Sequence, residues 1–252
     1  MTALAATAPP VAFTRPSLPR LTAVELRKMT DTRAGFWLLL ITGFLAAAIV
    51  TITAIWGDAP DQHFAEMFRG ALWVVSVVLP VVGILAVTSE WSQRTALTTF
   101  SLVPGRERVI AAKLVAGIAL ALVALVACLV TAAIGNLIVG GSWSLELSLL
   151  ANGALFEVLA VLGGIAFGLA FLSSPLAIVL YFVLPTAWAI LGESISALDK
   201  PAEWLDTSRT MQPLVDDTMA SGDWARLGTS VALWLGVVLV IGLLRLRRSE
   251  LK

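Results

Sequence analysis

The chain has 252 residues, of which 58% are hydrophobic and only 13% are charged. Soluble domains carry about 25% charged residues, so a soluble fold of this length could not bury so much apolar surface. The formal net charge is zero, which gives no indication of a nucleic-acid partner, and a single cysteine excludes a disulfide framework within the chain. The composition therefore indicates an integral membrane protein.

Residues 1–20 contain four prolines and no positive charge before Arg15, which argues against a cleaved signal peptide. We expect this segment to be a disordered cytoplasmic tail. Residues 21–34, LTAVELRKMTDTRA, then form a separate amphipathic segment.

This amphipathic segment opens with a Thr-x-x-Glu pattern, which is typical of a helix capping box. Ala23, Leu26 and Met29 share one helical face, whereas Glu25 and Lys28 face elsewhere. The pattern favours an interfacial helix lying flat on the inner leaflet over a cytosolic extension of the first span. The charged residues that we assign to this helix are Glu25, Arg27, Lys28 and Arg33.

Six apolar stretches approach or exceed the 20 or so residues that cross a bilayer core of about 30 Å. They predict an all-α protein with six transmembrane helices, at 36–56, 70–88, 114–139, 147–172, 175–197 and 227–244. The third stretch is longer than a span requires, so it either tilts or breaks near Gly135 and Asn136.

The distribution of Lys and Arg predicts that both termini are cytoplasmic. With the N-terminus inside, only four of the 17 basic residues lie outside, which agrees with the positive-inside rule. The C-terminal segment 245–252 is then a basic cytoplasmic tail, and the expected location is the plasma membrane. Two longer segments do not span: 89–113 inside, and the acidic 198–226 outside, where we expect a small helical cap.

The inner segment has a second amphipathic pattern. Trp91, Leu97 and Phe100 mark one helical stripe, and Pro104 with Gly105 ends the helix. The segment either follows the lipid headgroups as a long loop or forms a helix that docks a partner.

No catalytic motif is present in the sequence. There is no phosphate-binding loop, no H-E-x-x-H pair and no G-x-S-x-G elbow, and His63 is the only histidine. We therefore expect no enzymatic activity and no metal or cofactor bound by this chain.

Two groups of residues carry a family resemblance. They are Glu25-Leu26-Arg27-Lys28 with Asp31-Thr32-Arg33 before the first span, and Glu90, Arg94-Thr95, Leu102-Val103-Pro104, Arg106 and Lys113 after the second. Together with the order of the segments, they resemble the permease subunits of ABC-2-type transporters, in particular short actinobacterial exporter permeases. Arg94 stands where many members have Gly.

The resemblance implies a function. Two permease chains, identical or paralogous, pair in the membrane, and each docks on a separate cytoplasmic ATPase subunit that binds ATP and Mg²⁺. The transported molecule is expected to be an amphipathic drug, peptide or lipid-like compound, as in multidrug efflux. The residues implied to couple the permease to the ATPase are Glu90, Trp91, Arg94, Thr95, Phe100 and Arg106.

Four polar residues inside the spans are further candidates. A carboxylate in a membrane is costly unless it is paired, protonated or facing water. Glu157 is expected either to bridge helices by a hydrogen bond or to line a pathway, whereas Glu193 reaches the outer interface. Asn136 and Asn152 are candidate polar contacts. The alternatives to a permease are a secondary transporter driven by protons through Glu157, or a membrane-bound immunity or scaffold protein.

Overall fold

The computed structural model describes residues 16–57, 63–93 and 105–248. The described residues are almost entirely helical and include no strand, and six helices are long and apolar enough to cross a membrane. These six are α2 (Arg33–Trp56), α3 (Phe64–Ser92), α5 (Arg106–Val139), α6 (Leu147–Phe171), α7 (Ser174–Ser194) and the continuous helix Ser221–Arg248. For the described residues, the prediction of an all-helical fold with six helices long and apolar enough to span a membrane is confirmed.

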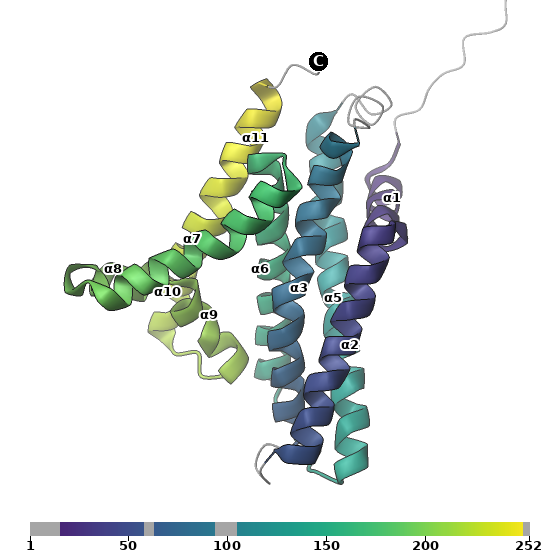
Figure 1. Cartoon of the computed structure of the whole chain (residues 1–252), viewed down its shortest axis with the longest axis vertical. Helices are drawn as coiled ribbons and strands as arrows, with labels where there is room; N and C mark the ends of the chain where they lie inside the picture. Colours follow the sequence, from purple (N-terminus) through teal and green to yellow (C-terminus); the bar gives the residue numbers. More distant parts are fainter. Residues whose placement is uncertain (1–15, 58–62, 94–104, 249–252) are drawn as a thin grey trace, which may run out of the picture.

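Helices α3 and α6 form the centre of the bundle, with α2 and α5 beside them (Figure 1). The backbones of α3 and α6 approach closely because a glycine, which has no side chain, lies at each crossing point. A Cβ atom on Gly164 would lie 2.2 Å from the carbonyl oxygen of Pro80, and one on Gly83 would lie 2.7 Å from that of Val161. The α3–α6 pair is therefore a rigid axis on which the other helices pack.

Helix α5 does not break at Gly135 and Asn136, but continues to Val139 and ends at Gly140, whose φ of 75° suits a left-handed helix cap. Gly135 is needed because a Cβ there would lie 2.3 Å from Cγ1 of Val50 on α2. The long third apolar stretch is thus one unbroken helix.

The segment 198–226, which was predicted to lie outside, folds back along the bundle. Helix α7 tilts away from α6, and α8 (Asp199–Leu205) and α9 (Thr207–Asp216) return toward the flank of α6 (Figure 1). The segment is helical, as expected for a cap, but α9 packs along α6. The last span begins at Ser221, six residues before the predicted 227, as α10 (Ser221–Val231), and continues through a π-helical stretch (Ala232–Val237) into α11 (Val238–Arg248).

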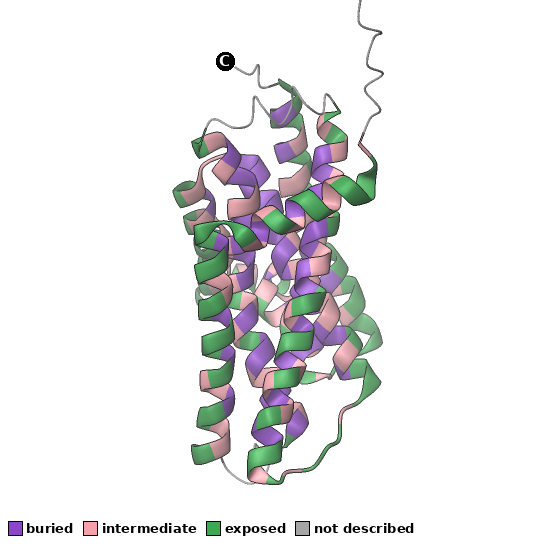
Figure 2. Ribbon diagram, turned by 90° about the vertical axis from the view of Figure 1, so that its right-hand side faces the viewer, coloured by how far each residue is buried: buried purple, intermediate pink, exposed green. Residues whose placement is uncertain are grey.

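Helix α1 (Leu18–Asp31) lies across the bundle, and α2 descends from its end (Figure 2). It begins three residues before the predicted 21 because Pro19, in the first turn, is already in a helical conformation. The predicted tail is accordingly shorter than 1–20, and residues 1–15 are outside the described residues. Thr32 separates the two helices, and its hydroxyl accepts a hydrogen bond from the Gly35 amide at the start of α2.

The predicted faces of α1 are wrong in one respect. Glu25 and Met29 are both buried against the bundle, while Ala23 is exposed. Residues four apart lie on the same helical face, so Glu25 turns inward together with Met29. The Glu25 carboxylate can be buried there because it lies beside two lysine ammonium groups.

Candidate functional site

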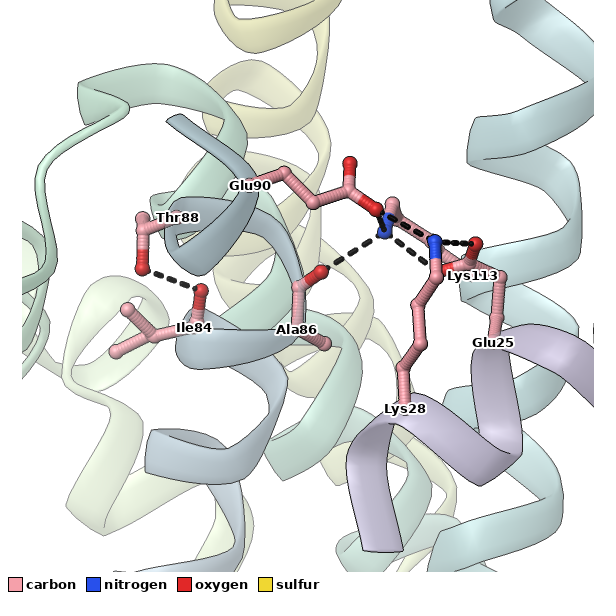
Figure 3. Close-up of polar contacts among 7 residues, drawn as sticks. All are labelled: Glu25, Lys28, Ile84, Ala86, Thr88, Glu90 and Lys113. Atoms are coloured by element: carbon pink, nitrogen blue, oxygen red, sulfur yellow. Dashed lines mark hydrogen bonds and ion pairs between the residues drawn. The ribbon is translucent and has the colours of Figure 1, made fainter. Parts of the chain in front are cut away.

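Four charged side chains meet where α1 crosses the ends of α3 and α5 (Figure 3). The Lys113 ammonium on α5 lies 2.5 Å from Oε2 of Glu25 and 3.0 Å from Oε1 of Glu90. The Lys28 ammonium lies 2.8 Å from Oε1 of Glu25 and 2.8 Å from Oε1 of Glu90. We call these four residues, Glu25, Lys28, Glu90 and Lys113, the charge cluster.

Three of the four members of the charge cluster are buried, and its formal charges balance. Lys113 is 3% exposed, Glu25 4% and Glu90 7%, and two ammonium groups face two carboxylates. Lys113 also donates to the backbone oxygen of Ala86 at 2.8 Å, so its three protons have three acceptors. Removing ions from water is costly, and an arrangement of this kind is stable only while every member keeps its partner.

Lys28 is the most exposed member of the cluster, and its protonation is favoured by its neighbours. Burial acts to lower the pKa of Lys28, but the hydrogen bonds and negative charges of Glu25 and Glu90 outweigh it, and the pKa lies above the ordinary value of 10.5. Lys28 is therefore cationic at physiological pH.

The position of the cluster in the chain is as informative as its geometry. Glu90 lies two residues before the end of α3, and Lys113 lies in the second turn of α5. The segment between these helices is the predicted coupling segment, so the cluster ties both of its flanks to α1. Sequence reasoning assigned Glu25, Lys28 and Glu90 to candidate sites. It named Lys113 only as part of the family resemblance and assigned it to no site.

The other predicted coupling and interfacial residues are dispersed. Trp91 packs half-buried against the core, and Arg106 donates to the backbone oxygen of Leu246 at 2.7 Å. Arg94, Thr95 and Phe100 lie outside the described residues. Two residues of the interfacial helix prediction, Arg27 and Arg33, are exposed, and Arg27 pairs with Asp31 at 3.1 Å.

Basic side chains also join the last helix to its neighbours at this end of the bundle. Arg245 donates to the backbone oxygen of Ala170 at 2.6 Å, near the C-terminal end of α6, and Arg247 lies 2.5 Å from the carboxylate of Glu107 on α5. Cations at a helix C-terminus satisfy free carbonyl groups and oppose the helix dipole. The ends of α5, α6 and α11 are thereby held together beside the charge cluster.

Thr88 provides a link from α3 to α7. It is fully buried, and its hydroxyl lies 2.7 Å from that of Ser174, the first residue of α7. The end of α3 that carries Glu90 is therefore hydrogen-bonded to the start of the tilted helix.

An apolar cavity of about 270 Å³ lies between α3, α6, α7, α9 and the π-helical part of the last span. We call it the aromatic pocket, because its walls include Trp73, Phe156, Phe167, Tyr181, Phe182 and Trp234. No charged residue lines it. Such a cavity suits an uncharged molecule.

The predicted polar residues within the spans do not line this pocket. Glu157 is fully buried on α6, and neither carboxylate oxygen has a hydrogen-bond partner in the described part of the chain, so the expected bridge between helices is absent there. Asn152 donates to Asp217 at 2.8 Å, and Asn136 donates to the backbone oxygen of Gly141 at 3.2 Å. Glu193 is exposed, one residue before the end of α7.

Comparison with known proteins does not assign the chain to a family. No protein-family model matches it, and no curated protein matches it in sequence. Among residues 16–57, 63–93 and 105–248, no group of His, Cys, Asp and Glu side chains is arranged to hold a metal ion. The charge cluster and the aromatic pocket are therefore the features from which a function must be argued.

Proposed function

We propose that this chain is the membrane-spanning permease subunit of an ABC-2-type exporter. In this proposal, a separate cytoplasmic ATPase docks on the inner segment 89–113 and supplies the energy. A second permease chain, identical or paralogous, completes the pathway, with one ATPase subunit for each permease. The coupling residues Glu90, Trp91, Arg94, Thr95, Phe100 and Arg106 are proposed from the sequence pattern.

The observation that carries the proposal is the attachment of both flanks of the inner segment to one buried cluster. Glu90 precedes the segment's centre and Lys113 follows it, and their side chains are 3.0 Å apart. Both also contact α1, through Lys28 and Glu25 respectively. A force on the inner segment would therefore move the ends of α3 and α5 and the transverse helix together, since breaking the buried pairs is costly.

The same contacts offer a route from the inner segment to the rest of the bundle. The end of α3 is joined to the start of α7 by Thr88 and Ser174, and α7 forms one wall of the aromatic pocket. A change in the angle of α3 would thus alter the pocket. The uncharged lining supports an apolar or amphipathic cargo, which agrees with efflux of a drug-like, peptide or lipid-like molecule.

The orientation is also part of the proposal. Helix α1, which carries Glu25 and Lys28, lies at the same end of the bundle as the start of α5 and the end of α11 (Figure 1). These ends carry Arg106, Arg245 and Arg247. The positive-inside rule favours placing this end in the cytoplasm, where an ATPase can reach it. The proposed location is the plasma membrane.

The test is co-purification of the full-length chain with a soluble ATPase encoded beside it. We expect the complex to form with the wild type and to be lost with Arg94→Glu and with Phe100→Ala. Matched controls are Lys200→Glu, which reverses an exposed charge on α8, and Phe44→Ala, which removes an exposed ring on α2. Both controls are expected to retain the complex.

Two outcomes would overturn the proposal. A complex that survives both Arg94→Glu and Phe100→Ala would show that the inner segment is not the docking site. If no ATPase accompanies the wild type, the chain is not a permease of this kind, and the proton-driven transporter and the immunity or scaffold protein become the better hypotheses.

A further inference from the structure

The aromatic pocket is built from rings that contact one another edge to face. The ring centroids of Trp73 and Phe156 are 5.5 Å apart, those of Phe167 and Tyr181 are 5.3 Å apart, and those of Tyr181 and Phe182 are 5.1 Å apart. Aromatic rings attract one another in edge-to-face arrangements, and a further ring can join such a set. The walls therefore favour an aromatic occupant over a plain hydrocarbon chain.

The last span adds an irregular wall to this pocket. Its π-helical stretch, Ala232–Val237, supplies Trp234 and Leu235 to the lining. The indole nitrogen of Trp234 donates to the backbone oxygen of Leu205 at 2.7 Å, which fixes the ring against the outer segment. Single π-helical turns are rare in helices and frequently occur at functional sites. The helix thus departs from regular α-helical geometry in the stretch that lines the pocket with Trp234 and Leu235.

The polarity of the lining limits the charge of the occupant. No Asp, Glu, Lys or Arg is among the described residues that line the pocket, so an ion there would lose its hydration without a partner from them. Two hydroxyl groups are available for hydrogen bonding, because Thr186 and Thr207 form no side-chain hydrogen bond within the described part of the chain. A neutral molecule with a hydrogen-bonding group satisfies both conditions.

The volume of the pocket limits the size of the occupant, and the position of the opening limits its route of entry. An apolar cavity of about 150 Å³ holds one benzene molecule, so the 270 Å³ of this pocket fits a molecule of about two rings. The most exposed apolar lining residues are Val77 at 54% and Trp73 at 40%, both on α3, and Phe182 at 36% on α7. The pocket therefore opens sideways between these helices, toward the bilayer.

We propose that the aromatic pocket binds a neutral, two-ring aromatic molecule that carries a hydrogen-bonding group and enters from the bilayer between α3 and α7. The proposal rests on the residues of this chain that line the pocket. The inference thus goes beyond the proposed function, and its failure would leave the docking of an ATPase untouched.

The test uses benzophenone, a neutral two-ring ketone that inserts into nearby C–H bonds when irradiated. The purified full-length chain in lipid nanodiscs is irradiated over a range of benzophenone concentrations, and the labelled peptides are measured by mass spectrometry. Met211 lines the pocket and is a preferred target of this reagent. We expect saturable labelling at Met211, at least tenfold reduced by excess diphenylmethanol, which has the same rings but is not photoreactive.

Two matched comparisons separate the pocket from general partition into lipid. Thr186→Trp and Ser76→Phe place a ring in the pocket and are expected to abolish the saturable labelling, whereas Val183→Trp, on the exposed face of α7, is expected to preserve it. The anionic analogue 4-benzoylbenzoate is expected to give no saturable labelling. Labelling that rises in proportion to concentration, that is equal for the anionic analogue, or that survives both pocket variants would overturn the proposal.

Discussion

The ammonium of Lys113 lies 2.5 Å from a carboxylate oxygen of Glu25, although 88 residues separate them in the chain. Both side chains are buried, and the contact joins α1, which lies across the bundle (Figure 2), to α5. A buried ion pair of this kind contributes more to specifying an arrangement than to stability, because much of its attraction is offset by desolvation. The loss of one partner of this pair should nevertheless change the stability of the protein measurably.

Replacing Lys113 by Met is expected to destabilise the fold strongly. The change leaves Glu25 and Glu90 buried with only Lys28 as a partner, so the cluster acquires an uncompensated negative charge. Breaking a buried pair in this way costs about 3–5 kcal/mol. The measurement is the free energy of unfolding of the detergent-solubilised protein.

Arg27→Met is the matched control, since Arg27 pairs with Asp31 on the exposed side of the same helix. Exposed pairs contribute about 0–1 kcal/mol, so this variant is expected to unfold close to the wild type. Equal losses for the two variants would show that the cluster is not a buried, interdependent network.

Gly164→Ala is expected to separate the central helices. The added Cβ would lie 2.2 Å from the carbonyl oxygen of Pro80, and a backbone atom cannot move aside as the end of a side chain can. Overpacking of this kind costs about 1–3 kcal/mol, which thermal unfolding in detergent would detect.

Gly43→Ala on α2 provides the comparison, because nothing lies within 4 Å of its added Cβ. Alanine is favoured over glycine inside a helix by about 1 kcal/mol, so this variant should be unchanged or more stable. A loss of stability with Gly43→Ala but not with Gly164→Ala would contradict the close α3–α6 contact.

The spans were predictable from the sequence because each is an apolar run long enough to cross the core of a bilayer. Their ends were less predictable. The last of these helices begins at Ser221 and includes Asp223 and Arg226, which lie before the predicted apolar run. The mean hydropathy of this stretch is low, so the apolar run did not reveal the start of the helix, although the helical hydrogen bonds extend through it.

The charge cluster could be predicted only in part. Glu25, Lys28 and Glu90 were singled out as members of short patterns, but their meeting with Lys113 depends on how α1 folds across the bundle. The pattern of one helix predicts that its charged residues face solvent. It cannot show that a residue elsewhere in the chain will pair with one of them in the interior. The aromatic pocket was not predicted at all, since its walls come from five separate elements.

Glu157→Leu is expected to stabilise the protein. Both oxygens of this fully buried carboxyl group lack partners among the described residues, and an apolar side chain of similar size avoids that cost. The gain should be about 1–3 kcal/mol, seen as a higher midpoint of thermal unfolding in detergent. A loss of that size would indicate that Glu157 has a partner in a second chain or in bound water.

The proposed orientation predicts opposite accessibilities for two engineered cysteines. Cys128 is buried and is replaced by Ala, and single cysteines then replace exposed Ser144, before α6, or exposed Arg248, at the end of α11. A membrane-impermeant maleimide added to intact cells should label the cysteine at position 144, and the cysteine at position 248 only after the membrane is opened. The reverse pattern would place both termini outside.

The most direct test of the account is whether the charge cluster transmits energy from an ATPase into the membrane helices. The full-length chain and its ATPase are reconstituted in nanodiscs with Glu25→Gln and Lys113→Met combined, a change that removes one charge of each sign and keeps Lys28 paired with Glu90 at 2.8 Å. The account predicts that the complex still forms, but that stimulation of ATP hydrolysis by the permease is lost. Stimulation equal to that of the wild type, in a complex that forms normally, would contradict it.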